Sequence, residues 1–122
     1  MIKLLFSCMV FKMNDRTLPE PTISDVSRIF RALGDEQRLR LLRTLLAAGR
    51  PLSQKNLAMV CQLSQANASK HLITLVSAGL VSREQQGNFV LFKPVLPLVA
   101  DVCDLVCGHV TQRIRTSYEA IV

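Results

Sequence analysis

The chain has 122 residues, a length that suits one domain with one modest hydrophobic core. Its formal net charge is +6 and 49% of its residues are hydrophobic, which predicts a folded domain and favours an anionic partner such as nucleic acid or a membrane surface. No apolar run approaches the roughly 18 residues of a membrane span, and the first ten residues lack the features of a secretion signal. We therefore expect a soluble, cytoplasmic protein.

Residues 1–21 are predicted to form an N-terminal arm. Pro19 and Pro21 lie there among charged and polar neighbours, which is typical of a linker. Met9 and Met13 are alternative starts, in which case the first twelve residues are an error in the assigned start. We expect residues 22–122 to form a single domain that binds a partner and dimerises.

Four helices are predicted in succession, because apolar residues recur at helical spacing between capping residues and glycines. Their expected ranges are 23–33, 35–48, 53–61 and 64–78, with caps at Asp35, Ser53 and Ser64 and a terminating Gly79. The period then changes to that of a β-hairpin, with strands at 80–84 and 89–93 around a turn at 85–88. A last helix begins near residues 96–98 and runs to about Glu119. The fold class is mainly α with a small β-hairpin, in short a winged helix-turn-helix.

The fourth helix is the candidate reading element. Ala68, Leu72, Leu75 and Val76 form one apolar stripe that would hold it on the core, and the opposite face is polar. Asp and Glu are absent from residues 37–83, which suits a surface that lies against phosphates. The candidate DNA-binding residues are Ser64, Gln65, Ala66, Asn67, Ser69 and Lys70 in this helix and Arg83, Gln86, Asn88 and Lys93 in the hairpin.

These residue types suit a helix at 64–78 in the major groove and a wing at 81–93 on the flanking backbone. Gln65 and Asn67 can pair with adenine or contact phosphate, and Lys70 can reach a phosphate or a guanine. Arg83 and Lys93 flank the expected wing tip. An ordinary amphipathic surface helix followed by an edge hairpin would give the same pattern. His71 fits a structural, partly buried histidine better than a phosphate contact or a metal ligand.

Several strings resemble the ArsR/SmtB family of bacterial transcriptional repressors. They are FRALGDEQRLRLLRTLL and LSQANASKHLITLVSAGLVSREQQGNFVLFK, followed by the closing helix. The resemblance covers about residues 23–117. It implies a homodimer built from the terminal helices, with each protomer inserting its recognition helix into one half of an inverted repeat. It also implies release from DNA when a metal ion, metalloid or oxidant alters the dimer.

The sensory residues depart from the best-known members of that family. The helix before the recognition helix carries only Cys61 where those members have a Cys-x-Cys pair. At the C-terminal zinc site of the family, Asp101 and Cys103 match the early positions, but the later positions are Arg113, Ile114 and Arg115. Cys103 and Cys107 remain, four residues apart on one helix face, and Cys8 could join them from a partner's arm. Packing, thiol oxidation, and binding of a metal or metalloid ion at Cys103 and Cys107 all fit this spacing.

Two other functional classes fit the sequence less well than a DNA-binding repressor. An enzyme is not expected, because the chain has no Gly-rich phosphate loop and no recognisable nucleophile setting. A winged-helix module for protein association alone would keep the fold but lose the basic reading face, which is present here. A regulator that responds to no effector is the remaining alternative.

Overall fold

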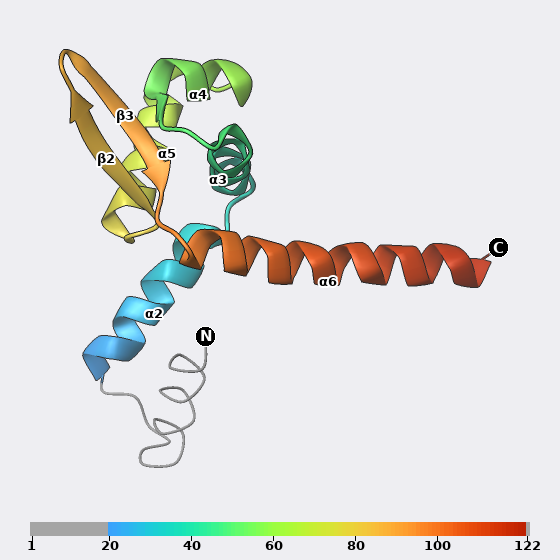
Figure 1. Cartoon of the computed structure of the whole chain (residues 1–122). Coiled ribbons are helices and arrows are strands. Elements are labelled where there is room, and N and C mark those ends of the chain that lie inside the picture. The colour runs from blue at the N-terminus through green and yellow to red at the C-terminus, as the bar shows by residue number, and fades with distance from the viewer. Residues whose placement is uncertain (1–19, 122) are drawn as a thin grey trace.

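The computed structural model of this protein describes residues 20–121. Helices and a small sheet form a body from which the last helix projects (Figure 1). In chain order the elements are α2 (Glu20–Leu33), α3 (Glu36–Ala48), β1 (Leu52–Ser53), α4 (Gln54–Val60), α5 (Gln65–Ser77), β2 (Val81–Gln86), β3 (Phe89–Pro94) and α6 (Leu98–Ile121). No helix in this part of the chain is long and apolar enough to cross a membrane.

Helix α2 begins at Glu20, three residues before the expected start, so the end of the expected arm is helical. Pro21 is tolerated there because the N–H groups of a first helical turn have no partner within the helix. Glu20 also places a negative charge at the positive end of the helix dipole. The rest of the arm, with Cys8 and the alternative starts Met9 and Met13, lies outside the described residues.

The turn between α4 and α5 has a defined helix-ending geometry. The Leu63 N–H donates to the carbonyl of Ala58 over 2.8 Å, and the Gln62 N–H donates to that of Met59 over 3.3 Å. Gln62 takes a positive φ of 56°, a position that glycine usually occupies in this motif. The same pair of bonds closes α5, where Gly79 has a φ of 77°. Local backbone bonding therefore sets the angle at which α5 leaves α4.

The sheet has three strands in the order β1-β3-β2, all antiparallel. The hairpin has a tighter turn than expected: Gln85 and Gln86 belong to β2, and Gln86 pairs with Phe89 across Gly87 and Asn88. Gly87 has a φ of 62°, which suits the two-residue turns that match the twist of a hairpin. Strand β1, which the sequence pattern did not predict, pairs Leu52 with Phe92 at the base of the wing.

One core joins the helices to the hairpin. Helix α3 is central to it, and its Leu41, Leu42 and Leu45 have at most 1% of their surface exposed. The other fully buried large side chains are Leu57, Leu72, Leu75, Leu80, Val81 and Val99. Helix α2 contributes less to the core, since Ala32 is its buried residue and Phe30 is 67% exposed. Among residues 20–121, the core therefore covers the inner side of α5 and one face of the hairpin, but it leaves Phe30 on α2 exposed.

The cap of α3 leads to a pH-dependent prediction. The Asp35 carboxylate accepts from the backbone N–H of Arg38 over 3.1 Å, and this bond is the main cause that holds the pKa of Asp35 below its ordinary 3.8. Because the folded-state pKa is lowered, the bond stabilises the fold above about pH 4, and this contribution is lost as pH falls through the folded-state pKa. We expect Asp35→Ala to lower the free energy of unfolding by about 0.5–2 kcal/mol at pH 7.

Urea unfolding at pH 7 and at pH 3 measures this effect. The gap between wild type and Asp35→Ala should narrow at the lower pH. Asp35→Asn is the control because it keeps a capping oxygen without a titratable group, so its stability difference from Asp35→Ala should be the same at both pH values. If the difference in unfolding free energy between wild type and Asp35→Ala is the same at pH 7 and at pH 3, the ionised carboxylate does not strengthen the cap.

Candidate DNA interface

Helix α5 has one buried side and one outward side. Ala68, Leu72 and Leu75 are at most 1% exposed, and Val76 is partly buried against the same core. The inner stripe predicted from the sequence is therefore confirmed. The outward side carries no carboxylate, and its exposed residues follow the helix at i, i+4, i+7 and i+11: Ala66, Lys70, Ile73 and Ser77. Ser69 lies half-buried beside this outward stripe.

The first turn of α5 is shaped by hydrogen bonds. Ser64 caps the helix, with its Oγ accepting from the Asn67 N–H over 3.1 Å. Gln65 is exposed, but its side-chain oxygen accepts from the Gln54 Nε2 over 3.1 Å, and Gln54 also donates to the Gln65 backbone carbonyl. Ala66 and Asn67 are exposed. The predicted contact residues of this turn thus lie at the surface, and one of them is held by a glutamine from α4.

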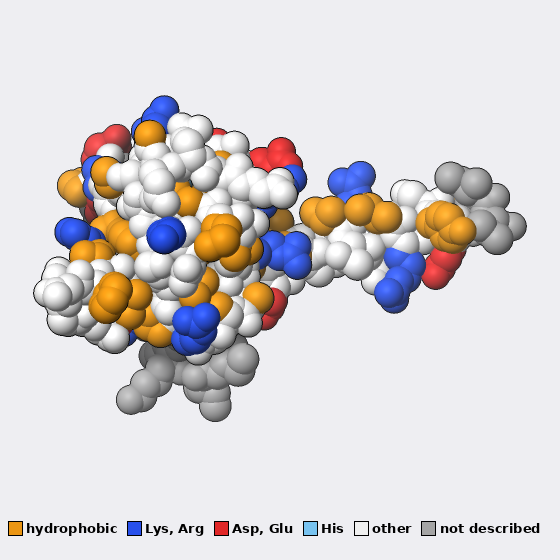
Figure 2. All heavy atoms as spheres, turned by 90° about the horizontal axis from the view of Figure 1, so that it is seen from above, with side chains coloured by type: hydrophobic (Ala, Val, Ile, Leu, Met, Phe, Trp, Pro, Cys, Tyr) orange, Lys and Arg blue, Asp and Glu red, His pale blue; other side chains and the backbone are white. Residues whose placement is uncertain are grey.

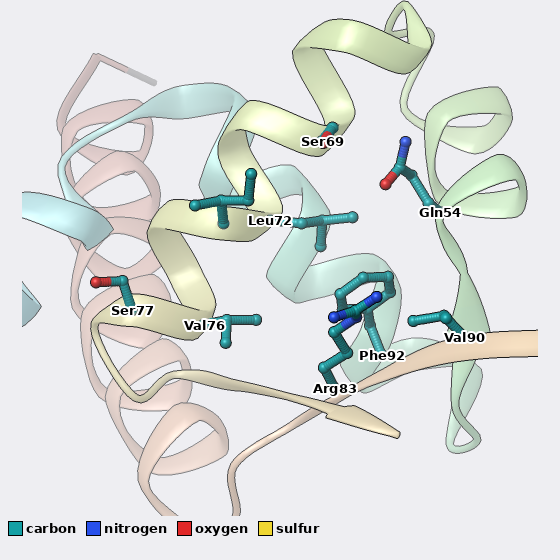
Figure 3. Close-up of a pocket in the computed structure, with 9 residues that line it drawn as sticks. Gln54, Ser69, Leu72, Val76, Ser77, Arg83, Val90 and Phe92 are labelled. Carbon is teal, nitrogen blue, oxygen red and sulfur yellow. The ribbon is translucent and has the colours of Figure 1, made fainter. Parts of the chain in front are cut away.

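A groove of about 590 Å³ separates α5 from the hairpin. Figure 3 shows Ser69, Leu72 and Val76 from α5 on one side and Arg83 with Phe92 from the hairpin on the other. Arg83 pairs in register with Phe92, so both side chains lie on the face of the hairpin that lines the groove. Arg83 forms no salt bridge among the described residues. The groove is therefore lined by apolar side chains and by Arg83, which has no ion-pair partner within residues 20–121.

The remaining wing residues are not equivalent. Gln86 and Asn88 are exposed at the turn, as a contacting wing tip requires. Lys93 lies near the base of the hairpin, opposite Ser82, and its Nζ is 2.9 Å from a Glu84 carboxylate oxygen. Lys93 thus flanks the tip from β3, as Arg83 does from β2, and both lie several residues from the turn itself. The charge of Lys93 is partly balanced by Glu84.

His71 is a structural residue that links α5 to α3. Its Nε2 lies 2.8 Å from Gln37 Oε1 and its Nδ1 lies 3.4 Å from Arg38 Nη1. A guanidinium only donates, so Nδ1 is the acceptor and Nε2 carries the proton given to Gln37. Arg38 also donates to the last carbonyls of α2, at Ala32 over 2.7 Å and at Arg31 over 3.1 Å. Arg38 thus ties three helices together, and the structural interpretation of His71 is supported.

The cysteines of α6 lie in different environments. Cys103 is buried against the core, and this burial raises the pKa of its thiol, while Cys107 is exposed. Cys61, on the turn after α4, lies 3.4 Å from Thr44 Oγ1. Among residues 20–121, no three His, Cys, Asp or Glu side chains gather closely enough to hold a metal ion. Within this part of the chain, the predicted Cys103–Cys107 pair therefore has no third metal ligand beside it.

Beyond Cys103, α6 leaves the body of the protein. Its apolar stripe continues through Val106, Val110, Ile114 and Tyr118, all exposed. Hydrophobic side chains are visible along this projecting arm in Figure 2. The stripe lies on the helix face that Val99 and Cys103 bury against the body. The exposed part extends for about 25 Å at about 1.5 Å per residue.

Two residues of this surface were missed by the sequence analysis. Gln54 was read only as part of a short helix, although it bonds Gln65 and lines the groove. Ile73 was not assigned to either face of the recognition helix, although it is 66% exposed. Its helical position relative to Ala66 and Lys70 would have placed it on the outward stripe.

Comparison with known proteins agrees with this geometry. A family model described as a helix-turn-helix domain matches residues 33–84, from the end of α2 to the middle of β2. The uncharacterized HTH-type transcriptional regulator YceK of Bacillus subtilis is 37% identical over 62 residues, which are 51% of this chain. The match spans 62% of the length of YceK.

Solved structures extend the likeness beyond this segment. The homodimeric winged helix-turn-helix DNA-binding domain of Mb0332 from Mycobacterium bovis, described as a possible ArsR-family regulator, superposes with a TM-score of 0.72 at 24% identity. That match covers 79% of this chain and 87% of the other. Rv0081 of M. tuberculosis matches with a TM-score of 0.67 at 26% identity, over 82% of this chain and 98% of its own.

The chain carries a winged helix-turn-helix domain with the fold of ArsR-family regulators. Within this winged helix-turn-helix domain, α4 and α5 are the helix pair and β2 with β3 is the wing. The proteins that share this fold include the Mb0332 domain, which is described as DNA-binding. The winged-helix fold class predicted from the sequence is confirmed.

Proposed function

We propose that this protein is a transcriptional repressor that binds double-stranded DNA as a dimer on an inverted repeat. In this proposal α5 enters the major groove and the wing contacts the flanking backbone. The observation that carries it is the outward stripe of α5, which is free of carboxylates and presents Lys70 between Ala66 and Ile73. A major groove admits one helix, and such a helix reads base edges with its outward side chains.

The groove beside α5 supports a phosphate contact. A helix seated in the major groove brings one DNA backbone close to the space between that helix and the wing. Arg83 lines this space from the wing side and forms no salt bridge among the described residues, whereas Arg40 on α3 is paired with Glu36 over 2.7 Å. We expect Arg83 to neutralise a phosphate there and Lys93, already paired with Glu84, to contribute less.

The dimer is supported by unused apolar surface. The exposed stripe of α6 has no protein to cover it among the described residues, and Ile23, Val26 and Phe30 add a second exposed stripe on α2. Two long helices with apolar stripes gain free energy by packing on each other, at about 25 cal/mol per Å² of apolar surface buried. A second copy of the chain supplies a matching pair of stripes, as in the homodimeric Mb0332 domain.

Arg83→Gln should weaken DNA binding on all sequences. Each protomer would lose one phosphate contact. The slope of log Kd against log salt concentration should therefore fall by about one for each contact removed. Fluorescence anisotropy on a labelled duplex selected from a randomised pool, at several salt concentrations, measures both quantities. Arg40→Gln is the charge-matched control and should leave the slope unchanged. Equal slopes for wild type and Arg83→Gln would contradict the placement of the wing on the backbone.

Ile114→Asp should convert the protein to a monomer. Ile114 lies 65% exposed on the α6 stripe, and a carboxylate there would be desolvated between two helices. Gln112→Asp adds the same charge on the opposite side of the helix and serves as the control. Sedimentation velocity should show a dimer for wild type and Gln112→Asp. A wild-type monomer at micromolar concentration would contradict the proposed assembly.

Thiol sensing at Cys103 and Cys107 is a secondary proposal. Cys107 lies on the apolar stripe of α6, so a dimer through this stripe would bring the cysteines of two copies near one another. Oxidation there, or binding of a thiophilic metal or metalloid ion, would change the packing of the stripe. The raised pKa of Cys103 makes its thiol a slow nucleophile, which leaves Cys107 as the first to react.

Replacing both Cys103 and Cys107 by Ser should abolish release of DNA by the effective agent. DNA binding is followed by anisotropy with peroxide, arsenite or zinc added, and the Cys61→Ser variant serves as the control that should still respond. If the double variant and wild type respond alike to all three agents, the two cysteines have a packing role only and the proposal of thiol sensing is wrong.

A further inference from the structure

Ile73 is an exposed apolar residue in the centre of the proposed reading surface. Its side chain is 66% exposed, although it belongs to a helix whose other large aliphatic residues are buried or partly buried. Together with Ala66, Ser69 and Lys70 it has the spacing i, i+3, i+4, i+7. The recognition helix of homeodomains uses the same spacing for the residues that read the major groove. Ile73 is therefore aimed outward at a position where base edges are read.

The two hollows beside Ile73 are both basic. On one side Ile73 lines the groove that holds Arg83. On the other it lines a smaller hollow of about 280 Å³ that is bordered by Arg28, Arg31 and Arg38. Neither hollow buries the Ile73 side chain, which forms part of the ridge between them. The two walls of a major groove are both phosphate backbones, so an apolar ridge between two basic hollows complements that shape.

Resting on the DNA binding proposed above, we propose that Ile73 reads a thymine by packing against its C5-methyl group. The thymine methyl is the apolar feature of the base edges in the major groove, where the other groups are hydrogen-bond donors and acceptors. Ile73 can make no hydrogen bond, so its discrimination depends on excluding water from this methyl group. It lies about one turn further along α5 than Lys70, so the thymine lies one or two base pairs beyond the base or phosphate that Lys70 contacts.

The test removes the methyl group without changing base pairing. A preferred duplex is selected with wild-type protein from a randomised pool, and each thymine is then replaced in turn by deoxyuridine. For wild type, we expect one thymine position in each half-site at which a single replacement weakens binding by about three- to fivefold. This is the effect of losing one buried methyl group. Ile73→Ala should lose this sensitivity at that position and keep the smaller effects elsewhere. Ile73→Val, which retains a methyl-bearing branch, should keep part of it.

Met59→Ala is the matched control, because Met59 is also 66% exposed and lies on α4 outside the recognition helix. It should show the wild-type pattern. Specific binding without any thymine whose methyl effect depends on Ile73 would overturn the inference and leave the proposed function standing. If selection yields no preferred duplex, the proposed function fails and the inference fails with it.

Discussion

The seating of α5 on the leucines of α3 is the interaction on which the rest of the structure depends. Ala68, Leu72 and Leu75 are almost completely buried, and burying each leucine side chain contributes about 1.5–3 kcal/mol. A rotation of α5 about its axis would expose these side chains, so the outward stripe is defined by what the inner stripe buries. The surface that we propose to face DNA is thus a consequence of core packing.

Hydrogen bonds between helices also help to fix the position of α5 on this apolar core. Arg38 bonds the final carbonyls of α2 and faces His71 on α5, while Gln54 holds Gln65 at the start of the same helix. These contacts link α2, which carries part of the proposed dimer surface, to the helix proposed to read DNA.

Much of this fold could be predicted because its signals are local. Asp35, Ser53 and Ser64 are caps in the structure as expected, and Gly79 ends α5 with the positive φ that favours glycine. Strand β1 could not be predicted, since it exists only through pairing with β3, about forty residues away. The hairpin turn was placed too early because Gln85 and Gln86 have no strong local preference.

The candidate interface was less predictable than the fold, since a side chain's neighbours decide whether it is available. Lys93 was grouped with Arg83 by charge, yet Glu84 lies beside the first and the groove beside the second. The bond between Gln54 and Gln65 depends on the angle between two helices. The exposure of Ile73 follows from the helical period alone, but an isoleucine on a polar face is easily assigned to the core.

The central claim is that the outward stripe of α5, with the wing beside it, is the surface that meets DNA. Titrating ¹⁵N-labelled protein with a selected duplex and following backbone amide shifts tests this most directly. We expect the largest changes in Ser64 to Ser77 and around Gly87, with small changes on the solvent side of α3 near Arg40. Changes that cluster on α3 or along α6, with α5 unaffected, would contradict it.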